Sequence, residues 1–122
     1  MKVLIIDDNE SITEAVKDFF EFENIECKTV NEGRIGLSEI ENQNFDLILL
    51  DIAIPSYTGI DILNELKRQR IAIANQNIII FTASVFNPEE INDFLETGVK
   101  EVLTKPISLD KLIYIKQKYL KK

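Results

Sequence analysis

Polar residues that can do chemistry follow directly after the apolar runs of this sequence. The runs at residues 3–6 and 47–50 end at aspartates, the run at 78–81 ends at a threonine, and a short segment at 101–104 ends at a lysine. In chain order these residues are Asp7, Asp8, Asp51, Thr82 and Lys105. Carboxylates can hold a divalent cation, and an ammonium group beside a hydroxyl group can hold a phosphate. The set indicates phosphate chemistry with a metal ion, provided that the fold brings its members together.

The donor types in this set select among metals. Three carboxylates in one site repel one another, and a divalent cation removes that repulsion. Hard oxygen ligands with room for water favour Mg²⁺. The sequence has no histidine and a single cysteine, Cys27, which disfavours zinc. Cys27 lies in a strand-like run, so we interpret it as a half-buried structural thiol rather than a reactive one.

The apolar runs have the length of buried strands, and helical periodicity follows each of them. Strands are expected near residues 2–6, 27–30, 47–50, 78–81 and 101–104. Helices are expected between them: over a stripe from Ile12 to Phe20, at residues 33–42, around 62–66, from Pro88 toward Gly98, and after Ser108. Near-continuous apolar strands alternating with helices are typical of a parallel sheet covered on both faces. The expected fold class is α/β, a five-stranded parallel doubly wound sheet.

Capping residues refine the expected helix ends. Ser11 and Glu14 have the spacing of a capping box at the start of the first helix. Asn87 followed by proline and two acids predicts the start of the fourth helix, and Gly98 its end. Ser108 can cap the last helix.

The carboxyl ends of parallel strands meet at one edge of a sheet, where ligands bind in such folds. Any one polar residue there could simply be a solvated strand end. Carboxylates, a hydroxyl and an amine at the same edge together favour a functional crevice, which we expect to be built from the polar set named above.

The composition indicates the kind of protein. With 122 residues and 45% hydrophobic residues, the chain is expected to form one domain over residues 1–122, without an output domain. The net charge is −7, and an acidic body disfavours direct nucleic-acid binding. Residues 100–122 carry seven basic and two acidic residues, which we interpret as a solvated helix face rather than a docking surface. Neither a signal peptide nor an apolar run long enough for membrane insertion is present, so a cytoplasmic location is expected.

Four motifs together resemble one known family over the whole chain, the receiver domains of two-component response regulators. The motifs are Asp7-Asp8, the segment from Asp51 to Gly59, Thr82-Ala83 and Lys105-Pro106. The resemblance implies a flavodoxin-like (βα)5 fold with strand order 2-1-3-4-5. It also implies a stand-alone signalling domain that assists only its own phosphorylation and dephosphorylation and is otherwise not an enzyme.

The resemblance assigns roles to the residues of the crevice. Asp51 is implied as the phosphoacceptor, and Asp8, Asp51 and the backbone carbonyl of Ala53 as direct Mg²⁺ ligands. Asp7 would act on the ion through water. The remaining two residues would hold the phosphoryl oxygens; they are Thr82 and Lys105.

The resemblance also implies partners. A sensor histidine kinase or a histidine phosphotransfer protein would donate the phosphoryl group. A downstream protein would bind the face formed by the fourth helix, fifth strand and fifth helix, with a homodimer as a further option. The Lys105–Pro106 bond is expected to be cis, aiming the lysine into the pocket.

The sequence departs from the family pattern at some positions. Val102 stands where these domains usually carry an aromatic residue that moves with the hydroxyl residue, which leaves the usual coupled switch in doubt. Ile54 replaces a usual methionine, a change expected to be mild. Ala53 and Ser84 lie beside the expected path of attacking water, so they should influence how long the phosphoryl group lasts.

Two other functions stay open from the sequence. Phosphatases that use a strand-end aspartate with Mg²⁺ carry a second aspartate two residues later as the acid/base, and here that position is Ala53. A scaffold or dimerisation module that is never phosphorylated is the second alternative. Labelling with a small phosphodonor would distinguish the signalling switch, the phosphatase and the scaffold from one another.

Overall fold

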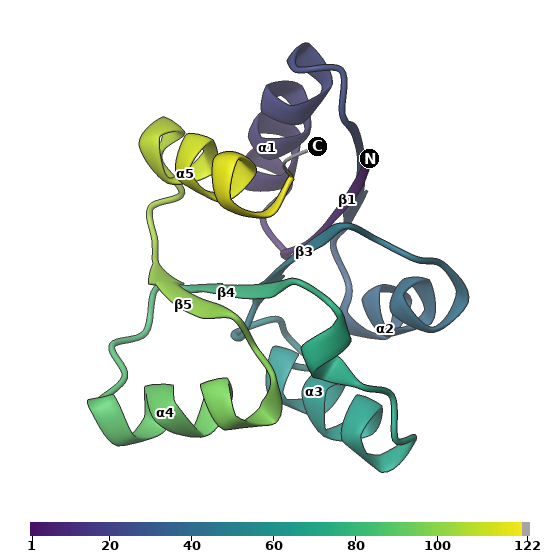
Figure 1. Cartoon of the computed structure of the whole chain (residues 1–122), viewed down its shortest axis with the longest axis vertical. Helices are drawn as coiled ribbons and strands as arrows, with labels where there is room; N and C mark the ends of the chain where they lie inside the picture. Colours follow the sequence, from purple (N-terminus) through teal and green to yellow (C-terminus); the bar gives the residue numbers. More distant parts are fainter. Residues whose placement is uncertain (121–122) are drawn as a thin grey trace.

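The computed structural model describes residues 1–120, which form a five-stranded sheet flanked by helices (Figure 1). The strands are β1 (Lys2–Ile6), β2 (Glu26–Val30), β3 (Leu47–Asp51), β4 (Ile78–Thr82) and β5 (Glu101–Thr104). The helices are α1 (Glu10–Phe22), α2 (Gly33–Asn42), α3 (Gly59–Arg68), α4 (Pro88–Thr97), α5 (Leu109–Tyr119) and the 3₁₀ helix η1 (Ile73–Asn75). The strand order is β2-β1-β3-β4-β5 and every pairing is parallel, which confirms the predicted fold class and order.

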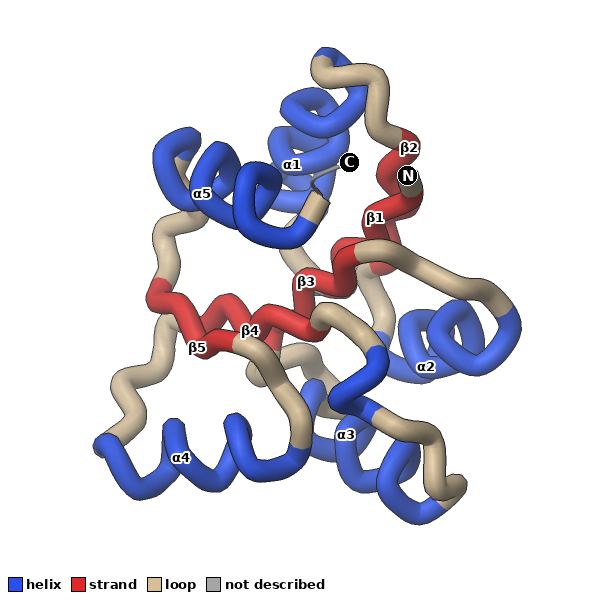
Figure 2. The backbone as a smooth tube through the Cα atoms, in the orientation of Figure 1, coloured by secondary structure: helices blue, strands red, loops and turns tan. Residues whose placement is uncertain are grey.

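Helices cover both faces of the sheet. Helices α1 and α5 lie on one face, and α2, α3 and α4 lie on the other (Figure 2). Each face has its own apolar core: Phe20 of α1 and Ile115 of α5 belong to one, whereas Leu37 of α2 and Ile62 of α3 belong to the other. Two cores on opposite faces explain why the central strands β1, β3 and β4 are apolar at nearly every position.

Strand β1 shows this arrangement residue by residue. Val3 and Ile5 pack into the core beneath α1 and α5, while Leu4 and Ile6 pack into the core on the opposite face. Each of these side chains is at most 1% exposed. Burying an aliphatic side chain of this size contributes roughly 1.5–3 kcal/mol, so the strands hold the sheet rigidly beneath their polar ends.

Helix α4 begins and ends where the sequence predicts. The side chain of Asn87 accepts the N–H of Glu90 at 2.8 Å, and the Glu90 carboxylate accepts the N–H of Asn87 at 3.1 Å. Pro88 is the first helical residue, and Gly98 ends the helix with φ of +113°. The backbone at Gly98 is left-handed, which only glycine adopts without strain.

The predicted start of α1 at Ser11 is wrong. The helix begins at Glu10, and Asn9 is its N-cap, with its side chain accepting the N–H of Ile12 at 3.2 Å. Asp7 accepts the N–H of Asn9 at 2.9 Å and thereby fixes the turn before the helix. Ser11 therefore lies inside the first turn, because an earlier residue already supplies the capping oxygen.

Helix α4 is held more loosely than the other helices. None of its side chains is buried. Its partly buried Phe94 packs against the core and against Phe86, with the ring centroids 5.2 Å apart. Few buried contacts mean a low local stability, which suits an element that moves.

We expect the Cys27 thiol to be inert in the folded protein. The side chain is 4% exposed, and burial raises the pKa of the thiol to about 12, with Glu21 adding to the effect. Reaction with a disulfide reagent at pH 8 should be about 100-fold slower, or more, than in denaturant, because the thiolate is the reactive form. Equal rates in the folded and unfolded protein would contradict this burial.

Candidate functional site

The ends of the central strands bring the predicted residues to one place. Strand β1 is paired between β2 and β3, so Asp7 and Asp8 directly follow a strand adjacent to the one that ends at Asp51. Strand β4 pairs with β3 and ends at Thr82, whose backbone carbonyl accepts the N–H of Lys105 at 2.8 Å. The parallel register thus places all of these residues at the same edge of the sheet.

Lys105 lies between two of the carboxylates. Its ammonium nitrogen is 2.8 Å from Asp7 Oδ2 and 3.2 Å from Asp51 Oδ2. Asp7 is 1% exposed and Asp51 is 4% exposed. Charges this deeply buried require a partner, and Lys105 provides it for both. The Lys105–Pro106 peptide bond is cis, as the family resemblance implied.

Burial and neighbouring charges shift the pKa values of Asp7 and Lys105. Burial raises the pKa of Asp7, since a buried carboxylate loses hydration; hydrogen bonds from Lys105 and Asn9 offset part of that effect, and Asp51 adds to it. Burial alone would lower the pKa of Lys105, but its hydrogen bond to Asp7 and the charges of Asp7 and Asp51 raise it overall. Lys105 is therefore a permanent cation at the bottom of the crevice.

Backbone groups fix the orientation of the buried carboxylates. Asp51 Oδ1 accepts the N–H of Ala53 at 3.1 Å, and Asp7 Oδ1 accepts the N–H of Asn9 at 2.9 Å. Each carboxylate thus uses one oxygen for a backbone donor and the other for Lys105. Two fixed oxygens per group make the site preorganised rather than adaptable.

The three aspartates form a group suited to Mg²⁺. Asp7, Asp8 and Asp51 each offer a carboxylate oxygen, and these oxygens lie within 4.8 Å of one another. Asp8 and Ala53 are exposed, so the open side of the group can keep water ligands. Hard oxygen donors with room for water fit Mg²⁺, whose octahedral shell usually retains several waters. The chemistry of the donors therefore supports the predicted ion.

Thr82 is the fully buried hydroxyl of the site. Its side-chain oxygen accepts the N–H of Ser84 at 3.0 Å, which leaves its own proton free to donate. Ser84 and Ala53 are both exposed near this edge, as expected for small residues beside an open pocket.

Sequence reasoning missed Asn31. Its side-chain amide donates to the backbone carbonyl of Asp7 at 2.8 Å and to the hydroxyl oxygen of Thr13 at 3.1 Å, and so ties the turn after β1 to α1. A signal was present, because Asn31 directly follows β2 in the same way that the other site residues follow their strands.

Two positions at which the sequence departs from the family pattern, Val102 and Ile54, are a strand residue and a core residue in the structure. Val102 is a partly buried residue of β5 that packs against the core on the α4 side. Ile54 is 2% exposed, so the isoleucine fills a core position.

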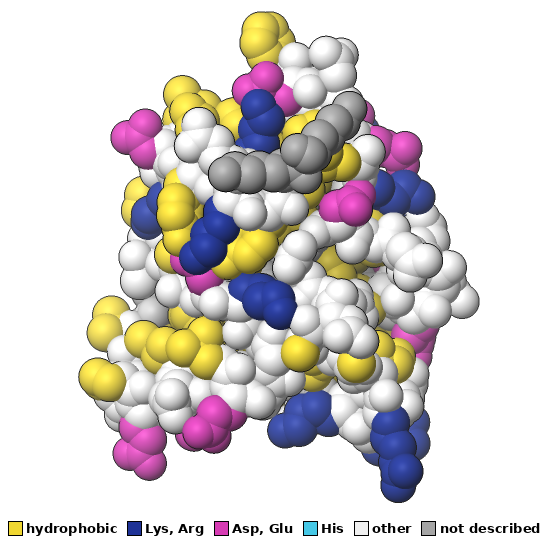
Figure 3. All heavy atoms as spheres, in the orientation of Figure 1, with side chains coloured by type: hydrophobic (Ala, Val, Ile, Leu, Met, Phe, Trp, Pro, Cys, Tyr) yellow, Lys and Arg dark blue, Asp and Glu magenta, His cyan; other side chains and the backbone are white. Residues whose placement is uncertain are grey.

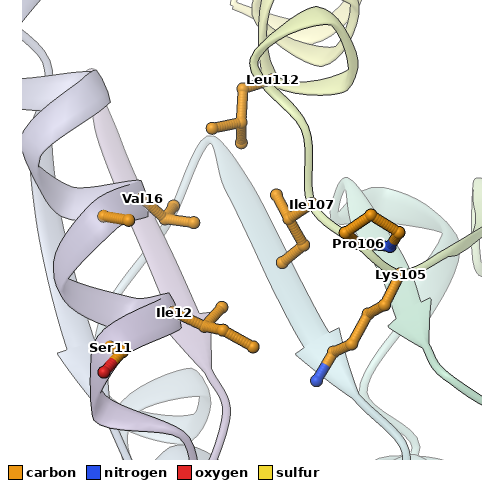
Figure 4. A pocket seen from close by; sticks show the side chains of 8 residues that line it. Ser11, Ile12, Val16, Lys105, Pro106, Ile107 and Leu112 are labelled. Atoms are coloured by element: carbon orange, nitrogen blue, oxygen red, sulfur yellow. The ribbon is translucent and has the colours of Figure 1, made fainter.

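An apolar groove leads to the site from the surface. It encloses about 500 Å³ between α1 and the segment that follows β5. Ile12 and Val16 line it from α1, and Ile107 and Leu112 face them (Figure 4). Lys105 lies at one end of this groove, so a partner seated there would reach the charged cluster.

Comparison with known proteins identifies the class that this fold and site define. Residues 3–116 match the family model of the response regulator receiver domain, and the chain belongs to this family. Phosphorylation of an aspartate and Mg²⁺ binding in an acidic pocket are properties of the family, whose members are phosphoacceptor signalling domains.

Individual relatives agree with the family. The chain is 33% identical over 108 residues to the uncharacterized transcriptional regulatory protein YclJ of Bacillus subtilis, and 32% identical over 111 residues to the response regulator SaeR of Staphylococcus aureus. These matches cover 88% and 91% of this chain, but only 45% and 46% of the relatives. The chain thus spans about half the length of these curated relatives.

Solved structures resemble this fold along nearly the whole chain. The Francisella response regulator 1452 receiver domain is 34% identical with a TM-score of 0.80, and the match covers 93% of this chain and 90% of that one. The chemotaxis response regulator CheY4 of Vibrio cholerae is 26% identical with a TM-score of 0.82, and the match covers 97% of both chains. Within residues 1–120, no helix is long and apolar enough to span a membrane.

Mg²⁺ should stabilise the folded protein through this cluster. At a Mg²⁺ concentration about ten times Kd, binding to the native state contributes ~1.4 kcal/mol. The melting temperature should then rise by roughly 5 °C in a calorimetric scan. Asp8→Asn should lose most of this rise, yet be at least as stable as the wild type without Mg²⁺, because one repelling charge is gone. Asp18→Asn, which changes an exposed residue of α1, is the control. An equal rise in the Asp8 and Asp18 variants would contradict the assignment.

Proposed function

We propose that this protein is a signalling switch that accepts a phosphoryl group on Asp51 from a histidine kinase or a histidine phosphotransfer protein. The proposal rests above all on the position of Lys105, whose ammonium group lies 3.2 Å from Asp51 and 2.8 Å from Asp7. A cation held against the acceptor carboxylate is ready to bind the oxygens of a phosphoryl group attached there.

Phosphoryl transfer to Asp51 requires one bond to form and one to break. An oxygen of Asp51 forms a bond to phosphorus while the phosphorus–nitrogen bond of the donor breaks, and the imidazole keeps the bonding electrons. Asp8, Asp51 and the Ala53 carbonyl would hold Mg²⁺, with Asp7 acting through water, and the ion would supply positive charge near the transferring oxygens. Lys105 can exchange its contact with Asp51 for one with a phosphoryl oxygen.

Thr82 completes the binding of the product. The aspartyl phosphate adds negative charge and new acceptor oxygens. The buried Thr82 hydroxyl has an unused proton and lies at the end of the strand that pairs with β3. Donation of this proton to a phosphoryl oxygen would pull on the loop between β4 and α4.

The groove between α1 and α5 is the proposed contact for the phosphodonor. It reaches Lys105, and its apolar character continues past the groove end to the exposed Phe22 and Leu109. A donor protein bound there would bring its phosphohistidine to the open side of the crevice. Because a histidine kinase takes phosphate from ATP, the same proposal places the protein in the cytoplasm.

The proposed output face is α4, β5 and α5. Acidic side chains gather over α4 and basic ones over α5 on the face shown in Figure 3. The loosely held α4 follows the loop that begins directly after Thr82. A downstream protein would recognise this face in its phosphorylated arrangement, and a second copy of this chain is the alternative occupant.

Strand β5 is linked to α5 by side chains, which offers a route for the signal despite Val102. Glu101 of β5 accepts the hydroxyl of Tyr114 at 2.9 Å and the hydroxyl of Tyr119, and it pairs with Lys118 at 3.0 Å. Burial alone would raise the pKa of Glu101, but hydrogen bonds from Tyr119, Lys118 and Tyr114 lower it overall. A displacement of β5 that starts at Lys105 would therefore move α5 as well.

Labelling with acetyl phosphate and Mg²⁺ tests this function. The wild type should take up about one phosphoryl group per chain, and Asp51→Asn should take up none, because the acceptor oxygen is lost. Asp18→Asn should label like the wild type. Wild-type protein that stays unlabelled would indicate a scaffold, and steady release of phosphate over many turnovers would indicate a phosphatase.

We also propose that the domain works without an attached output domain, as a diffusible regulator. The support is the match with the Vibrio cholerae CheY4 chain, of which this chain covers 97%. An immunoblot of source cells should show a band near 14.0 kDa. A band near twice that mass would contradict this proposal, since the curated relatives are about twice as long.

A further inference from the structure

We propose that Tyr57 and Arg34 are positioning residues that hold the loop after β3 in the shape required for Mg²⁺ binding. The inference rests on the proposed function, because Ala53 of this loop is the proposed backbone ligand. Neither residue touches the reacting atoms. Their contacts with each other join the loop to the start of α2, which comes from a distant part of the sequence.

The loop at residues 52–58 is firmly attached at its base. The Gly59 N–H donates to the Ile52 carbonyl at 3.1 Å, and the side chains of Ile52 and Ile54 are buried in the core. Its tip is different. Ser56 has φ of +68°, a left-handed conformation that a non-glycine residue rarely adopts, and Pro55 and Ser56 are exposed. Within the tip, the Tyr57 N–H donates to the Pro55 carbonyl at 2.8 Å, and a contact from outside the loop would further hold this strained conformation.

Tyr57 and Arg34 supply that contact. The guanidinium carbon of Arg34 lies 4.3 Å from the centre of the Tyr57 ring, which is a cation–π distance. Tyr57 is half-buried and also packs against the core, whereas Arg34 is exposed. The two side chains line a cavity of about 250 Å³ that Asp8 lines as well. The contact therefore shares this cavity with Asp8, one of the proposed Mg²⁺ ligands.

The backbone at Gly33 shows independently how closely the loop and α2 approach. A Cβ atom built on Gly33 would lie 1.9 Å from the Tyr57 carbonyl oxygen, far inside any allowed contact. Glycine at this position lets α2 and the loop meet backbone to backbone. The side chain of Arg34, the next residue, then covers the Tyr57 ring.

The consequence for the site follows from the hydrogen bond at Ala53. Its N–H donates to Asp51 Oδ1 at 3.1 Å, so the orientations of the Ala53 peptide and the phosphoacceptor carboxylate are coupled. A loop that already keeps one conformation loses no further conformational entropy when the Ala53 carbonyl binds the ion. Without the contact between Tyr57 and Arg34, the loop would have to become ordered on metal binding, which would lower the Mg²⁺ affinity.

Amide hydrogen exchange of the whole chain without Mg²⁺ tests the inference directly. The Ala53 amide reports on the loop, the Gly59 amide on its base, and the Leu49 amide in β3 on the sheet. Tyr57→Leu and Arg34→Gln should speed exchange at Ala53 about threefold, in line with an exposed cation–π contact, and leave Gly59 and Leu49 unchanged. Tyr57→Phe keeps the ring and should exchange like the wild type.

A charge control and measurements of Mg²⁺ affinity complete the test. Arg70→Gln removes the same charge beyond the far end of α3 and should change nothing. By titration calorimetry, Tyr57→Leu should weaken Mg²⁺ binding about threefold, whereas Tyr57→Phe should not. Gly33→Ala should weaken it too, because the new methyl group displaces the Tyr57 carbonyl.

The failures of the two proposals can be told apart. Wild-type exchange and Mg²⁺ affinity in Tyr57→Leu, or equal losses in Tyr57→Leu and Tyr57→Phe, would overturn the positioning role. Wild-type protein that binds no Mg²⁺ would instead overturn the proposed function. Neither readout needs phosphorylation, so the result does not depend on the identity of the donor.

Discussion

Three carboxylates at one edge of a sheet repel one another, and the rest of this structure depends on how that repulsion is met. The single charge of Lys105 is shared by Asp7 and Asp51, at 2.8 and 3.2 Å, while Asp8 is exposed. The protein thus keeps an incompletely neutralised site on an otherwise well-packed fold. A divalent cation can offset the remaining negative charge, and the cation and Lys105 together can then interact with the negative charge of a phosphoryl group.

The parallel sheet makes this arrangement predictable from sequence. Uninterrupted apolar strands that end in polar residues imply a sheet buried on both faces, and its carboxyl edge then collects those residues regardless of their separation in the chain. For this reason Asp8, Asp51 and Lys105 could be expected to lie together, whereas the role of each residue came from the family resemblance. Local signals were equally sufficient for α4, where Asn87 and Gly98 fix both ends.

Other features depend on contacts that no local pattern encodes. The N-cap of α1 is Asn9 rather than Ser11, and Asp7 holds Asn9 in place through its N–H. The 3₁₀ helix η1 buries Ile73 in the core, although its surroundings carry no helical pattern. Tyr57 and Arg34 are ordinary surface residue types whose importance appears only once α2 and the loop after β3 lie side by side. Periodicity predicts elements well, but it says little about which loops touch.

The central claim is that Asp51 carries the phosphoryl group, and chemical trapping tests it most directly. Borohydride reduces an aspartyl phosphate to homoserine, which peptide mass spectrometry locates. After incubation with acetyl phosphate and Mg²⁺, the account predicts homoserine at position 51 and unmodified aspartate at positions 7 and 8. Homoserine at either of those two positions, or at none of the three in protein that had bound phosphate, would contradict it.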